Sequence, residues 1–134
     1  MTRVLMLSFL MACSGSESSE VQRCAQCGMR VDTAPRWMAG YDERHFDAPK
    51  CMFRWAESQG ADLEEAWVLD YYEGERLDVA RAWFVVGSDV VGPMGDDLVP
   101  MPDRIKADLF ARDHGGRVVT MRDIDATLLH SLDP

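Results

Sequence analysis

Two cysteines and a methionine lie close together in the segment Cys24-Ala25-Gln26-Cys27-Gly28-Met29 of this 134-residue chain. Thiolate and thioether sulfurs are soft ligands, which select Cu(I), zinc or iron–sulfur clusters, and the thioether favours Cu(I) among these metals. A C-x-x-C pair alone is equally compatible with zinc, with a disulfide and with thiol redox chemistry. The segment therefore predicts a metal site first, with these alternatives open.

Two of the alternatives have weaker support in the rest of the chain. A structural zinc site normally has a second ligand pair, whereas the remaining cysteines are Cys13 and Cys51 and the histidines are scattered. A thioredoxin-like redox pair opens a helix, and the glycine and proline of residues 28–35 are poor at starting one. Metal binding by soft sulfur ligands remains the leading interpretation.

The N-terminal residues are typical of an exported lipoprotein. A basic start is followed by a short apolar run, and Leu10-Met11-Ala12-Cys13 resembles the lipobox of bacterial lipoproteins. The run is too short for a membrane-spanning helix, which needs about 20 residues, so we expect residues 1–12 to be a signal peptide. By the same resemblance, Cys13 is lipidated and becomes the first residue of the mature protein.

Behind this cysteine, the polar residues up to position 22 have the composition of a flexible tether, and residues 23–134 have the size of one ordinary domain. We therefore expect a membrane-anchored domain that faces the periplasm. The formal net charge of −9 argues against nucleic-acid binding, which depends on lysine and arginine neutralising phosphates, and permits docking of a basic partner.

The pattern of residues predicts an α+β domain. Asp42-Glu43 separates two short aromatic segments and indicates a β-hairpin, and Pro49 suits the first turn of a helix that Asp47 would cap and that would end at Gly60. The nearly continuous apolar run 82–86 indicates a strand buried on both faces. The remaining expected elements are a strand at 66–72, a helix at 103–113, a strand at 117–121 and a helix at 122–132. This order suggests two similar halves of strand-strand-helix-strand type. The tryptophans are expected in the core, and Asp96-Asp97 is expected to form a solvated turn.

A set of motifs in a fixed order resembles the NosL family, the lipoprotein copper chaperones that help assemble the copper centres of nitrous oxide reductase. The motifs are Cys24-x-x-Cys27-Gly28-Met29, His45-Phe46-Asp47, Cys51-Met52-Phe53, Asp70-Tyr71, Ala80-x-Ala82-x-Phe84-Val85-x-Gly87, Gly92-Pro93-Met94-Gly95, and Phe110 with His114-Gly115-Gly116. The resemblance implies Cu(I) binding, a lipid anchor and a fold related to the organomercurial lyase domain. It also implies a site formed by Cys27, Met29 and Met94.

The residues can also be weighed without the family. Cys27 and Met29 are two positions apart, so in an extended segment both side chains would lie on one face and share a metal ion. Met94 lies between glycines in an expected loop, where a methionine has little reason to be in the core. Further candidate ligands are Cys24, Cys51, His45 and His114. Each also has a structural alternative: Cys24 could form a disulfide, Cys51 could be a buried residue of a helix, and the histidines could simply end a strand and a helix.

These observations predict a binding protein rather than an enzyme. The leading hypothesis is an extracytoplasmic lipoprotein that binds Cu(I) and delivers it to a copper enzyme, and the resemblance points to nitrous oxide reductase or its maturation complex as the client. The alternative is an enzyme, either a thiol oxidoreductase that uses Cys24 and Cys27 or an organomercurial-lyase-like protein that uses separated cysteines. A third possibility is a structural zinc domain.

Overall fold

The structure is a computed structural model, and it describes residues 20–134. The expected signal peptide and the lipidation site Cys13 lie outside the described residues. Within residues 20–134, no helix has both the length and the apolar character needed to cross a membrane.

The described chain contains short strands, three α-helices and three single turns of 3-10 helix. The strands are β1 (Ala39–Tyr41), β2 (Arg44–Phe46), β3 (Trp67–Leu69), β4 (Arg76–Asp78), β5 (Trp83–Val86), β6 (Val91–Gly92), β7 (Gly95–Asp96), β8 (Val99–Met101) and β9 (Arg117–Thr120). The helices are α1 (Pro49–Gln59), α2 (Arg104–His114), α3 (Ala126–His130), η1 (Val31–Thr33), η2 (Pro35–Trp37) and η3 (Met121–Asp123).

Two antiparallel sheets repeat one topology. The first sheet has the order β2-β1-β3-β4 and the second has the order β8-β5-β9, while β6 and β7 form a separate hairpin. In the first sheet, β1 lies between β2 and β3, and β3 follows helix α1 in the chain; β4 is an additional edge strand. In the second sheet, β5 lies between β8 and β9, and β9 follows helix α2. The α+β class expected from the sequence is confirmed.

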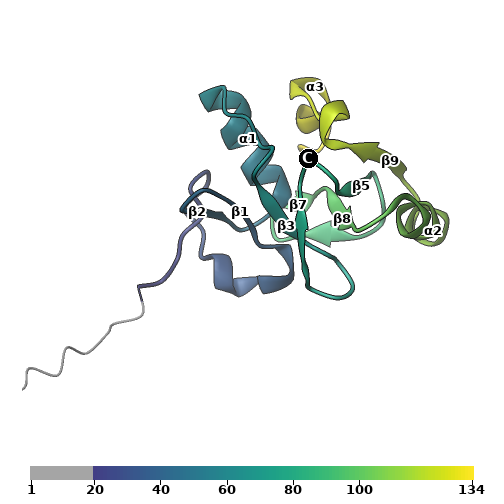
Figure 1. Cartoon of the computed structure of the whole chain (residues 1–134), viewed down its shortest axis with the longest axis horizontal. Coiled ribbons are helices and arrows are strands. Elements are labelled where there is room, and N and C mark those ends of the chain that lie inside the picture. The colour runs from purple at the N-terminus through teal and green to yellow at the C-terminus, as the bar shows by residue number, and fades with distance from the viewer. Residues whose placement is uncertain (1–19) are drawn as a thin grey trace, which may run out of the picture.

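Helices α1 and α2 each cover the sheet of their own half. Helix α1 packs on β1, β2 and α3, whereas α2 packs on β5, β8 and β9. Figure 1 shows α1 and α3 side by side, with α2 beside the second sheet at the far end of the domain. This arrangement leaves the N-terminal cysteine segment next to the first sheet and the start of α1.

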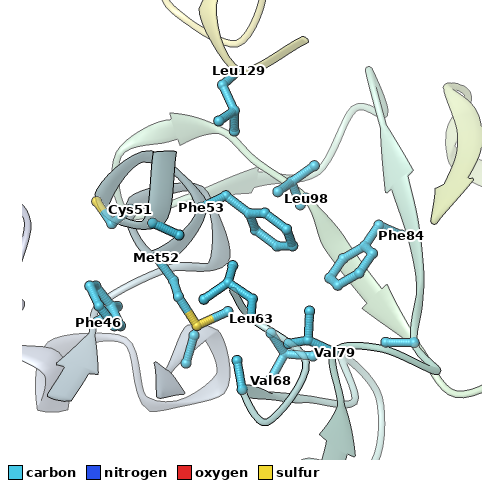
Figure 2. Close-up of a cluster of buried hydrophobic side chains, with 14 of the residues drawn as sticks. Phe46, Cys51, Met52, Phe53, Leu63, Val68, Val79, Phe84, Leu98 and Leu129 are labelled. Carbon is cyan, nitrogen blue, oxygen red and sulfur yellow. The ribbon is translucent and has the colours of Figure 1, made fainter. Parts of the chain in front are cut away.

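The core follows from the burial of β5 on both faces, as its apolar sequence predicts. Phe84 belongs to a core cluster with Met52 and Phe53 of α1, and Val85 belongs to a second cluster with Phe110 of α2. Figure 2 shows Phe53 and Phe84 facing each other, whereas the sulfur of Cys51 lies on the side of α1 that faces away from them. Cys51 is therefore buried, but its sulfur does not pack against the Phe53 and Phe84 rings.

The two ends of α1 agree with the expected signals, whereas two other expectations at helix ends are wrong. Helix α1 begins at Pro49 and stops before Gly60, its C-cap residue, which adopts a left-handed φ of 63°. The structure adds a cap at α2, where Asp103 accepts from the Lys106 N–H. The expectation that Asp47 caps α1 is wrong: the cap position is Ala48, with no side-chain hydrogen bond. The expected helix 122–132 is also interrupted, because Asp125 caps a new helix, α3, by accepting from the Leu128 N–H.

Other differences concern strands and tryptophans. The first segment of the expected hairpin is shorter than its aromatic run, because residues 35–37 form η2. Trp37 is buried, but Trp55, Trp67 and Trp83 are only half-buried, and an arginine guanidinium lies over each ring at 4.0–5.3 Å from the centroid. Large rings at the sheet and helix edges thus use cation–π contact rather than complete burial.

Candidate metal centre

The cysteine segment folds as a tight turn held to the first sheet. An isolated bridge joins Arg23 to Arg30, and the Cys24 N–H donates to the Met29 carbonyl at 2.8 Å. Gly28, with a φ of 76°, closes the turn by donating to the Cys24 carbonyl at 2.9 Å. The expectation that this segment is extended is therefore wrong, because residues 25–27 form a turn that Gly28 closes.

Strand β2 and helix α1 supply the other side of the site. The Ala25 N–H donates to the His45 carbonyl at 2.9 Å, which fixes the turn beside β2. The chain then leaves β2 through Asp47 and enters α1, of which Cys51 is the third residue. Asp47 and Cys51 therefore face the cysteine turn from the start of the helix.

Four side chains converge in this place. The sulfurs of Cys24, Cys27 and Cys51 and a carboxylate oxygen of Asp47 all lie within 4.8 Å of one another, and we call them the cysteine cluster. All three cysteines are free thiols; Cys24 and Cys51 are buried, and Cys27 lies at the exposed rim. Three soft sulfurs and one carboxylate are a donor set that fits a thiophilic metal such as Cu(I) or Zn(II).

The hydrogen bonds of the cluster distribute its protons unevenly. The Cys51 thiol donates to Cys24, and the backbone N–H groups of Asp47, Cys27 and Gln26 also point at the Cys24 sulfur, so the pKa of Cys24 falls to about 6. Partial burial, with the Cys24 charge nearby, raises the pKa of Cys27 to about 11. The bond to Cys24 and burial raise the pKa of Cys51. Ionisation is thus favoured at Cys24 over Cys27 and Cys51, and a thiolate is the form of cysteine that binds a metal.

Asp47 connects the exposed rim to the buried part of the cluster. Its Oδ1 accepts from the Cys27 thiol at 3.5 Å, while its Oδ2 is buried and has no hydrogen-bond partner. A buried carboxylate oxygen without a partner is costly unless a ligand satisfies it, so this oxygen is consistent with a site that binds a cation.

The two candidate methionines are exposed rather than packed in the core. Met29 has 39% of its surface exposed at the end of the cysteine turn, and Met94 has 37% exposed at the tip of the β6–β7 hairpin. Both side chains are therefore available to a ligand at the surface, as the sequence argument for Met94 requires.

The two candidate histidines lie outside the cysteine cluster. His45 contacts the edge of Trp67 at 6.1 Å between ring centroids. His114 ends α2, where its Nδ1 lies 2.9 Å from Asp89 Oδ1 and its ring stacks on Phe110. Within the described residues, neither belongs to the group of cysteine and carboxylate side chains that could hold a metal ion.

Two further charged side chains are buried, and the sequence pattern did not predict this. Lys50 and Asp97 are buried, although Asp97 was expected in a solvated turn; only its neighbour Asp96 is exposed. Asp97 Oδ1 accepts from the N–H groups of Lys50 and Leu98 at 2.9 and 2.8 Å, and burial raises the pKa of this carboxyl to about 7. Asp47 was likewise interpreted as a cap, but it precedes the helix, and its carboxylate lies beside the cysteines instead.

Comparisons with known proteins point to one family. A model of the NosL family matches residues 16–129. The copper-binding lipoprotein NosL of Stutzerimonas stutzeri is 37% identical over 57 residues, which cover 42% of this chain and 30% of that protein. The crystal structure of the copper chaperone NosL from Shewanella denitrificans superposes with a TM-score of 0.67 at 21% identity, over 79% of this chain and 91% of that one, and so shares the fold.

These relatives are named for copper binding and not for an enzymatic activity, in agreement with the expectation of a binding protein. The family match spans both sheets and the cysteine cluster. The chain belongs to the NosL family.

Proposed function

We propose that this chain is a lipid-anchored, periplasm-facing protein that binds Cu(I) and delivers it to a copper enzyme during assembly of its copper centre. The client proposed is nitrous oxide reductase or its maturation complex. The cysteine cluster is the single observation that carries the proposal, because it gathers from two separate segments three thiols and the buried Asp47 carboxylate, one oxygen of which has no hydrogen-bond partner.

The graded exposure of the sulfurs supports transfer rather than storage. Cys24 and Cys51 are buried, Cys27 is at the rim, and the thioethers of Met29 and Met94 are exposed at the surface. Cu(I) exchanges readily between soft sulfur ligands, so we propose that Cys27, Met29 and Met94 receive and release the ion while Cys24 and Cys51 hold its buried side. No redox change is needed for such ligand exchange.

Competition titration of the reduced protein with a Cu(I) chelator under anaerobic conditions tests binding. We expect one Cu(I) per chain, preferred over Zn(II), and the largest loss of affinity for Cys27→Ser, because Cys27 is the accessible thiol of the cluster. Smaller losses are expected for Met29→Leu and Met94→Leu, because a thioether is a weaker ligand than a thiolate. The matched control is Met52→Leu, since Met52 is a fully buried core residue and its substitution should leave the affinity unchanged.

Delivery requires a second measurement. Cells that lack this chain should accumulate nitrous oxide reductase with a reduced copper content, restored by the wild-type chain and not by Cys27→Ser. Undetectable Cu(I) binding by the purified protein would refute the binding proposal, and a fully copper-loaded reductase in the deletion strain would refute the proposed client.

A further inference from the structure

Lys50 is the one base among the four buried charged side chains of residues 20–134; the other three are Asp47, Asp70 and Asp97. Its side chain is buried in the first turn of α1, directly before Cys51, with 1% of the residue exposed. Burying an ammonium group is costly unless its protons are bound, so the partners of this group indicate what it is used for.

The partners are main-chain carbonyls and not carboxylates. Lys50 Nζ donates to the Met94 carbonyl at 2.9 Å and contacts the Leu132 carbonyl at 3.4 Å. No ion pair of Lys50 with a carboxylate is formed within residues 20–134. An ammonium present only to neutralise the nearby acids would pair with one of them, whereas this one donates to the backbone of the hairpin tip and of the turn that follows α3.

A second contact fixes the same hairpin to the same helical turn. The Lys50 N–H donates to Asp97 Oδ1, and Asp97 directly follows β7. The other oxygen of Asp97 lies against Gly92 of β6, where an added Cβ would approach it to 3.1 Å. One residue of α1 therefore holds the β6–β7 hairpin at its tip and at its base.

The hairpin needs such support because it is very short. Each of its strands has two residues, and isolated two-stranded hairpins are at best marginally stable in water. A weak ligand such as a thioether contributes to metal binding mainly when it is already held in position, since ordering it on binding costs conformational entropy. The position of Met94 is therefore as important as its sulfur.

We propose that Lys50 is a positioning residue, which holds the β6–β7 tip against α1 so that the Met94 thioether reaches a Cu(I) ion in the cysteine cluster. This inference rests on the proposed function, and it adds a residue that supplies no ligand atom. Lys50 acts through the Met94 carbonyl, so its contribution to copper binding depends on the presence of the Met94 sulfur.

A double-mutant cycle tests this dependence. Anaerobic Cu(I) affinities are measured for the wild type, Lys50→Met, Met94→Leu and the double variant. Loss of a residue that orients a metal ligand typically lowers affinity 10–100-fold, so we expect Lys50→Met to lower it by about tenfold, the low end of that range because a thioether is a weak ligand, and close to the effect of Met94→Leu. The double variant should be no weaker than Met94→Leu alone, within about twofold. The matched control is Lys106→Met, which makes the same substitution at the other lysine of the chain, exposed on α2, and should change nothing.

A spectroscopic measurement separates positioning from general loss of structure. In protein labelled with ¹³C at the methionine methyl groups, Cu(I) should shift the signals of Met29 and Met94 in the wild type. In Lys50→Met the Met94 shift should be lost and the Met29 shift retained. If Lys50→Met does not fold, the same comparison is made on Lys50→Gln, which keeps a donor but is shorter and uncharged.

Retention of the Met94 shift in the folded Lys50 variant, or losses of affinity that multiply in the double variant, would overturn the inference while leaving Cu(I) binding by the cluster intact. A wild type that binds no Cu(I) would overturn the proposed function, and the inference with it.

Discussion

The buried carboxyl of Asp97 should make the folded protein less stable as the pH rises, and Asp97→Asn should remove that dependence. Asp97 has 2% of its surface exposed, and burial raises its pKa from 3.8 to about 7. Below pH 3.8 the group is protonated in both the folded and unfolded states. Between pH 3.8 and 7 only the folded state keeps the proton, so the free energy of unfolding falls with increasing pH, and above pH 7 the loss is complete.

The size of the effect follows from the shift in pKa. Each unit corresponds to about 1.4 kcal/mol, so a rise from 3.8 to about 7 amounts to about 4 kcal/mol lost between acid and neutral pH. Asparagine keeps an oxygen for the N–H groups of Lys50 and Leu98 but places an amide where Oδ2 has no partner, at a cost of about 1–3 kcal/mol. Asp97→Asn should therefore be about 1–3 kcal/mol more stable than wild type at pH 8, with the gain shrinking towards zero near pH 5.

Urea denaturation of the reduced, metal-free protein at pH 5, 6, 7 and 8 measures the difference. Asp96→Asn is the matched control, because it removes the same charge from the exposed neighbouring residue and should stay within about 0.5 kcal/mol of wild type throughout. A difference between wild type and Asp97→Asn that does not change with pH would refute the reasoning. A loss of stability in Asp97→Asn at pH 8 would show instead that the ammonium of Lys50 stabilises the carboxylate.

Two further predictions concern the first sheet and the N-terminus. Gly40→Ala should destabilise the fold by about 1–3 kcal/mol, because the new Cβ would come within 2.3 Å of the Trp67 ring. Thermal denaturation measures this loss of stability, which should disappear in a Trp67→Leu background if the clash is the cause. Cys13→Ser should release the protein from membranes without changing its Cu(I) affinity, because a flexible tether separates anchor and domain; membrane fractionation checks the first effect, and an unchanged distribution would contradict lipidation at Cys13.

The sequence by itself determined the local elements and the family. Proline and glycine delimit α1, the apolar run of β5 indicates burial on both faces, and the ordered motifs identify the NosL resemblance that the family match confirms. These features are readable because each depends on backbone chemistry or on a short-range pattern. The relation to the organomercurial lyase domain and the lipidation of Cys13 stay predictions.

The tertiary structure decided which of the candidate residues meet. Spacing along the chain favoured Cys27 with Met29, and the turn at Gly28 and the approach of α1 also bring Cys27 together with Cys24, Cys51 and Asp47. The same packing buries Asp97, which no local pattern separates from the exposed Asp96 beside it. Local sequence specifies the path of each segment. The partners of a thiol, a carboxylate or an ammonium group depend instead on how the hairpins and α1 pack together, because those contacts join residues that are far apart in the chain.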